Sequence, residues 1–139
     1  MIKTENVTKY FNRGNPDEVL AVNDVSIEVK EGDFAIFKGP SGSGKTTLLS
    51  LIGCMSRPTS GKVIVGDRDV SRLPERFMTE VRRNTFGFIF QQFNLIPTLS
   101  ALENVMLPME IILINFFIVI ITPVKIHIPY IRMMFGHRI

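Results

Sequence analysis

The chain has 139 residues, 45% of them hydrophobic, and a net charge of +3, which suits one domain with a buried core. A single cysteine, Cys54, excludes an internal disulfide framework and fits a reducing compartment. The N-terminus has no apolar run of the kind found in secretory signals.

The charge is unevenly distributed along the chain. Residues 1–110 hold 13 basic and 13 acidic residues, so the excess comes from the tail, residues 111–139, which has Lys125, Arg132 and Arg138 and no acid. The high pI is therefore a property of the tail. Because no basic stripe is interleaved with aromatic residues, the sequence does not indicate nucleic-acid binding.

The first elements expected are strands. Residues 2–9 and 19–29 are rich in strand-forming residues and are joined by a polar, turn-rich link at residues 12–16. A Glu-Gly-Asp turn at residues 31–33 then leads into an apolar run, Phe34–Phe37, which predicts a further strand.

A glycine-rich segment follows that run. Residues 39–46 read Gly-Pro-Ser-Gly-Ser-Gly-Lys-Thr and match G-x-x-x-x-G-K-[ST] without a mismatch, and residues 45–52 predict a helix directly after it. Glycines let backbone N–H groups turn inward around a polyphosphate, and the helix directs its positive end to the same place. The alternative is a Gly/Ser-rich loop with a solvated lysine.

This phosphate-binding loop, or P-loop, assigns roles to its residues. Lys45 is placed to reach the β- and γ-phosphates, and the Thr46 hydroxyl is placed to reach Mg²⁺. The nucleotide-binding residues predicted in this segment are Gly39, Ser41, Gly42, Ser43, Gly44, Lys45, Thr46 and Thr47.

Later elements of the first 110 residues are shorter. A turn at residues 58–61 precedes a strand at 62–65, and Pro74 stands at the first position of a helix expected over 74–83. Residues 86–90 predict another strand. Ser100 and Glu103 form a capping box that opens a short helix ending before Pro108.

Residues 111–139 differ in character. The run 111–121 is nearly all β-branched or aromatic, and Pro123 and Pro129 follow it. As a helix, the run would span roughly 17 Å, against a hydrocarbon core of roughly 30 Å. A membrane span and a buried strand remain open, but we favour a tail unrelated to residues 1–110, produced by truncation or a change of reading frame.

Besides the P-loop, three further segments are similar to segments of one known family. Residues 1–110 resemble the N-terminal half of an ATP-binding cassette (ABC) transporter ATPase, most closely its lipoprotein-release and macrolide-export branch. Residues 6–11 are similar to the opening strand of that family and its adenine-stacking aromatic, which is Phe11, with Tyr10 as the alternative. Residues 88–97 resemble the strand that ends in the Q-loop, so Gln91, or Gln92 beside it, would sense Mg²⁺ and the attacking water.

The third piece, residues 99–105, resembles the surface that meets the membrane subunit. Phe93, Leu95 and Ile96 are candidate apolar contacts there, or else core residues. One departure is Lys38, just before the P-loop, where an apolar residue would be easier to bury. We expect its ammonium to reach solvent or an acid.

The resemblance implies an α/β fold, the N-terminal portion of a P-loop NTPase with an antiparallel β edge and an incomplete central sheet. It implies ATP and Mg²⁺ as cofactors, with Lys45 and Gln91 as catalytic residues and Thr46 and Gln91 at the metal. It also implies pairing of two ATPase domains, membrane-spanning permease subunits as partners, and a cytoplasmic location at the inner face of the plasma membrane.

Other parts of the family pattern do not occur in this sequence. It has no LSGGQ-type signature and no apolar strand ending in Asp-Glu, and His127 and His137 lack the context of the family's switch histidine. We therefore expect this chain alone to bind nucleotide with little or no hydrolysis. The alternative is a non-catalytic nucleotide-binding or docking fragment.

Overall fold

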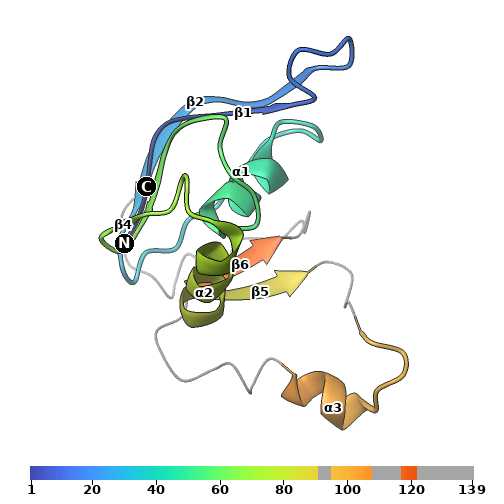
Figure 1. Ribbon diagram of the computed structural model, residues 1–139. Coiled ribbons are helices and arrows are strands. Elements are labelled where there is room, and N and C mark those ends of the chain that lie inside the picture. The colour runs from blue at the N-terminus through green and yellow to red at the C-terminus, as the bar shows by residue number, and fades with distance from the viewer. Residues whose placement is uncertain (91–94, 108–116, 122–139) are drawn as a thin grey trace.

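The computed structural model describes residues 1–90, 95–107 and 117–121, of which Phe90 and residues 117–121 are described by their backbone alone. Two sheets organise the chain (Figure 1). One is antiparallel, with strand order β2-β1-β3-β4, and the other is the parallel pair β5-β6. The elements in chain order are β1 (Ile2–Phe11), β2 (Val19–Val29), α1 (Lys45–Ile52), β3 (Ser60–Val65), β4 (Arg68–Asp69), α2 (Glu75–Thr85), β5 (Phe86–Phe90), α3 (Ala101–Met106) and β6 (Phe117–Ile121).

A bulge in β1 keeps one face of the strand apolar. Ile2 and Thr4 face the core in strict alternation, but Asn6 takes a left-handed φ of 50° and the pairing register with β2 shifts between Thr4 and Val7. The extra residue restores the inward direction at Val7, which is fully buried. The buried Thr4 hydroxyl donates to Val25 O at 3.0 Å, so its polar group is satisfied.

The core lies between the antiparallel sheet and helices α1 and α2. Its buried members come from six strands and helices and from the segments between them: Ile2, Val7, Val22, Leu48, Leu51, Ile52, Cys54, Val63, Val65, Val70, Met78 and Phe86. β3 shows the alternation expected of a half-buried strand, with Val63 and Val65 inside and Ile64 between them partly exposed. This packing holds α1, and the loop before it, against the sheet.

The strand expected at Phe34–Phe37 does not form. In the structure this segment is not a strand, and Phe34 and Ile36 are about half exposed, although Phe37 packs against the core. A strand is held by hydrogen bonds to its neighbours, and one at the centre of a parallel sheet needs neighbours on both sides. Among the described strands, none pairs with this segment, so its sequence preference is not realised.

β5 pairs with a strand that comes from the apolar run of the tail. β6 pairs with it in parallel register, Phe86 opposite Phe117 through Phe90 opposite Ile121. The strand alternative for residues 111–121 is therefore the one that forms over Phe117–Ile121. Residues 111–116 and 122–139 lie outside the described part of the chain.

The helix boundaries differ slightly from the sequence expectation. α2 begins at Glu75, and Pro74 is its N-cap residue with an extended ψ of 151°, so the proline stands one position before the helix. α3 has the predicted capping box: the Ser100 side chain accepts from Glu103 N, and the Glu103 carboxylate accepts from Ser100 N at 2.8 Å. Over the described residues, no helix has the length and apolarity needed to cross a membrane.

Candidate functional site: a phosphate-binding loop on helix α1

Gly44 joins the glycine-rich loop to α1 and allows the loop to lie close to β2. It is the N-cap residue with φ 84°, and a Cβ atom added there would collide with the backbone oxygen of Ala21. Glycine is therefore required both by the left-handed conformation and by the close approach of the backbone. The contact places the loop beside β2 at residues 21 and 22.

The first turn of α1 is open toward a ligand. Its N-cap has no side-chain hydrogen bond, and the turn contains no acidic residue. The first N–H groups of a helix have no partner within it, and they attract anions together with the helix dipole. The Thr46 side chain stands in this turn and is exposed, whereas Thr47 is partly buried.

The Lys45 side chain folds back onto the loop and is hydrogen-bonded to it. Its ammonium donates to the backbone oxygens of Gly39 at 2.8 Å and Pro40 at 2.6 Å, and to Ser43 Oγ at 3.0 Å. All three donors of the ammonium are thus used by the loop's own oxygens. A phosphate oxygen is a stronger, charge-assisted acceptor, so the same three donors can be exchanged for an anion.

The sequence on both sides of the loop carries no acidic residue. Between Asp33 and Asp67 the sequence has four basic residues, Lys38, Lys45, Arg57 and Lys62, and no acidic residue. Lys38 is exposed, so its ammonium reaches solvent as expected. No carboxylate of this segment opposes a negatively charged ligand at the loop.

Phe11 is connected to the loop by β2, the strand that pairs with β1 and that Gly44 approaches. It pairs with Val19, and Lys9 on the same strand pairs with Val22, next to the Ala21 oxygen that approaches Gly44. Phe11 is 43% exposed. Its pairing partner, Val19, lies two positions before Ala21 on β2. Tyr10 points to the opposite face of the strand.

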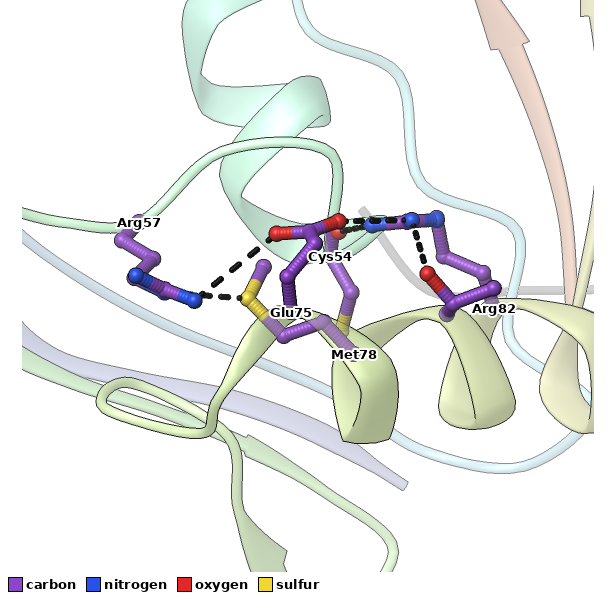
Figure 2. A network of polar contacts seen from close by, with 6 residues as sticks. Cys54, Arg57, Glu75, Met78 and Arg82 are labelled. Carbon is purple, nitrogen blue, oxygen red and sulfur yellow. Dashed lines mark hydrogen bonds and ion pairs between the residues drawn. The ribbon is translucent and has the colours of Figure 1, made fainter.

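The far end of α1 is anchored to α2 by Arg82 (Figure 2). This guanidinium donates to the backbone oxygen of Cys54, just beyond the helix, and to Thr79 Oγ1 at 2.7 Å, and it pairs with Glu75 at 2.8 Å. Glu75 also pairs with Arg57 at 3.7 Å. Because α1 has no basic residue in its last turn, Arg82 supplies the positive charge that its carbonyl end attracts.

Cys54 belongs to this anchor and is inert. Its side chain is fully buried, and burial raises the pKa of the thiol to about 11, with a smaller opposing effect from the Arg82 charge. At neutral pH the sulfur therefore stays protonated and is a poor nucleophile. Cys54 is a core residue.

The structure brings together most of the residues that the sequence assigned to nucleotide binding. The P-loop residues form one loop against α1 and β2, with Phe11 on the adjoining strand. Gln91, Gln92 and Phe93 lie outside the described residues. Leu95 and Ile96 are exposed, so they are not core residues.

Sequence reasoning missed three supporting residues, Ala21, Lys9 and Arg82. Ala21 has no distinguishing signal, because its role depends on the position of a backbone oxygen. The Lys9 and Phe11 spacing of two along a strand could have indicated a shared face. Nothing in the sequence alone links Arg82 to residue 54.

Comparison with known proteins identifies the family. The model for "ABC transporter" matches residues 22–133. An uncharacterized ABC transporter ATP-binding protein of Methanocaldococcus jannaschii, MJ0796, is 48% identical over 109 residues, which cover 78% of this chain and 46% of the relative. A dimeric structure of that cassette in a post-hydrolysis state, bound to ADP and Pi, superposes with a TM-score of 0.74 at 46% identity, covering 79% of this chain and 47% of that one.

Two relatives belong to the branch expected from the sequence. The macrolide export ATP-binding/permease protein MacB of Hyphomonas neptunium is 44% identical over 78% of this chain and 17% of its own length. The lipoprotein-releasing system ATP-binding protein LolD 1 of Rhodopseudomonas palustris is 38% identical over 78% of this chain and 48% of its own. The chain thus spans about half the length of the single-cassette relatives it matches. It belongs to the ABC transporter family and has the fold of the N-terminal part of its ATPase cassette.

Proposed function

We propose that this chain binds Mg-ATP as the N-terminal part of the ATP-binding subunit of an ABC transporter. The observation that carries the proposal is the open first turn of α1, whose glycine-rich loop lies against β2 and holds Lys45 by three exchangeable hydrogen bonds. The phosphates would lie over the loop and draw the Lys45 ammonium away from the loop's own oxygens.

The other roles follow the same arrangement. The Thr46 hydroxyl, exposed in the first turn, would hold Mg²⁺ together with Gln91. The metal would neutralise phosphate charge, and Lys45 would add to that stabilisation. The adenine would stack on Phe11, since an aromatic face gains stacking contact without hydrogen-bond readout.

In the intact family member, we propose that two such domains pair around ATP and drive membrane-spanning permease subunits from the cytoplasmic side of the plasma membrane. The relatives named for lipoprotein release and macrolide export, and the dimeric form of the archaeal cassette, support this assignment. The exposed Leu95 and Ile96, and α3 after them, supply an apolar surface for such a permease contact.

For the chain by itself, we propose binding with little turnover. Of the groups that the family uses for hydrolysis, the sequence has those that hold phosphate and metal, but no signature and no strand ending in Asp-Glu. The domain boundary near residue 110, with an unrelated tail after it, remains part of this proposal. The second candidate, a docking fragment that occupies a permease without nucleotide, is favoured by the exposed apolar residues of α3 alone.

The test is calorimetric titration of the purified full chain with Mg-ATP, followed by measurement of phosphate release. We expect binding that is lost in Lys45→Ala and retained in Lys38→Ala, since Lys38 is exposed and it is Lys45 that is hydrogen-bonded to the loop oxygens. Absence of binding at millimolar Mg-ATP would refute the proposal. Lys45-dependent phosphate release would refute the claim of little turnover.

A further inference from the structure

Lys9 lies on β1, the strand that ends in Phe11. The Lys9 ammonium lies 5.2 Å from the centroid of the Phe11 ring and over its face. Residues two apart on a strand share a face, so this contact arises from the spacing of the two residues in β1. The negative face of the ring attracts the cation.

Lys9 is itself fixed from a second side. Its ammonium donates to the backbone oxygen of Arg57 at 2.8 Å, in the loop that follows α1. Thr59 in the same loop accepts from Tyr10 N at 2.9 Å, so the end of β1 is held in place beside this loop. The cation over Phe11 is therefore anchored at the opposite end of α1 from the P-loop.

This arrangement makes the two faces of Phe11 unequal. Lys9 covers one face, while Phe11 as a whole residue remains 43% exposed. The P-loop approaches β2 at Ala21, whose neighbour Val22 is the pairing partner of Lys9. A nucleotide held by the loop thus meets a ring whose orientation is already restricted.

We propose that Lys9 is a positioning residue for the nucleotide base: it holds the Phe11 ring from one face and leaves the other face for the purine. The proposal rests on the proposed nucleotide binding and adds a determinant of base recognition to it. Lys9 acts through Phe11 and does not contact phosphate. Holding the ring reduces the entropy that stacking would otherwise cost.

The experiment compares Mg-ATP with Mg-tripolyphosphate, which has the three phosphates and lacks the nucleoside, by calorimetric titration of the full chain. In Lys9→Met, which keeps the length of the side chain and removes its charge, we expect Mg-ATP to bind about 3- to 5-fold more weakly. The affinity for Mg-tripolyphosphate should stay the same. Lys9→Arg, which retains a cation for the ring, should restore the affinity for Mg-ATP.

The chain offers a matched control. Arg13 lies over the ring of the neighbouring aromatic, Tyr10, at 5.5 Å, so Arg13→Met removes an equivalent contact from the alternative base platform. This variant should leave both affinities unchanged. In Phe11→Ala, Mg-ATP should bind about tenfold more weakly, and adding Lys9→Met to it should have no further effect.

The outcomes separate the two proposals. If the wild-type chain binds neither ligand, the proposed function fails and the role of Lys9 fails with it. If both ligands bind but Lys9→Met weakens them equally, or weakens neither, the nucleotide site stands and the role of Lys9 is refuted. A loss of Mg-ATP affinity in Arg13→Met in place of Lys9→Met would also refute it, by moving the base platform to Tyr10.

Discussion

The region before β5 and the helix α3 after it use apolar residues in opposite ways. In the first part, Leu51 of α1 is 1% exposed and Val63 of β3 is fully buried, because a four-stranded sheet and two helices enclose them. In the second part, α3 has no buried residue, and its Leu102 is 68% exposed. Apolar composition alone does not make a core; the difference lies in whether packing partners are available.

The same contrast occurs within a few residues around the P-loop. Phe34–Phe37 needs neighbouring strands and is not a strand, whereas the loop at 39–46 forms from local turns, glycine conformations and one lysine. Local features form here although the predicted strand beside them does not. This explains how the glycine-rich loop can take its conformation next to a segment that is not a strand.

The strongest way to test the contrast is to remove one leucine from each part. Leu51→Ala should lower the free energy of unfolding by about 2–5 kcal/mol, because it leaves a cavity under the sheet. Leu102→Ala should change it by less than about 0.5 kcal/mol, since the residue is exposed. Urea denaturation measures both. Equal losses of unfolding free energy in the two variants would show that α3 contributes to the core and would refute the difference between the two regions.

A smaller effect is expected where the loop meets β2. Gly44→Ala should cost about 2 kcal/mol or more, since alanine is strained at φ 84° and its Cβ would meet the Ala21 oxygen. The matched control is Gly14→Ala, which has the same φ of 84° but open space around it.

We expect Gly14→Ala to cost about 1 kcal/mol, the conformational part alone. Thermal unfolding of the two variants then isolates the contribution of the contact between the loop and β2. If both variants lose the same stability, the loop does not depend on its approach to the sheet.

The smallest of the three effects concerns the anchor of α1. Arg82→Met should cost about 1–2 kcal/mol, because the Cys54 oxygen, Thr79 and Glu75 lose their shared donor. Arg83→Met, on the same helix but exposed, should cost less than about 0.5 kcal/mol. Chemical denaturation compares them. An Arg82 variant as stable as the Arg83 variant would mean that α2 does not anchor the P-loop helix.

Much of the local structure could be predicted from the sequence. The capping box at Ser100, the strands β1, β2 and β3 and the helix that begins at Lys45 follow from patterns only a few residues long, whereas β4 was not predicted. The bulge at Asn6 could not be predicted, because it depends on the register with β2. The strand predicted at Phe34–Phe37 was wrong for a related reason, since strand formation is decided by partners distant in sequence.

The candidate site likewise has a part that local sequence patterns predict and a part that depends on contacts between distant segments. The residues predicted to bind phosphate are given by an eight-residue pattern, since backbone turns and a helix start are local events. The support of that loop is not given by this pattern: the Ala21 oxygen beneath Gly44, the Lys9 cation over Phe11 and the Arg82 bonds beyond α1 join segments that the sequence separates. The chain by itself determines which groups can meet a polyphosphate. Only the tertiary structure decides which contacts fix the positions of these groups, because such contacts depend on how strands and helices distant in sequence pack together.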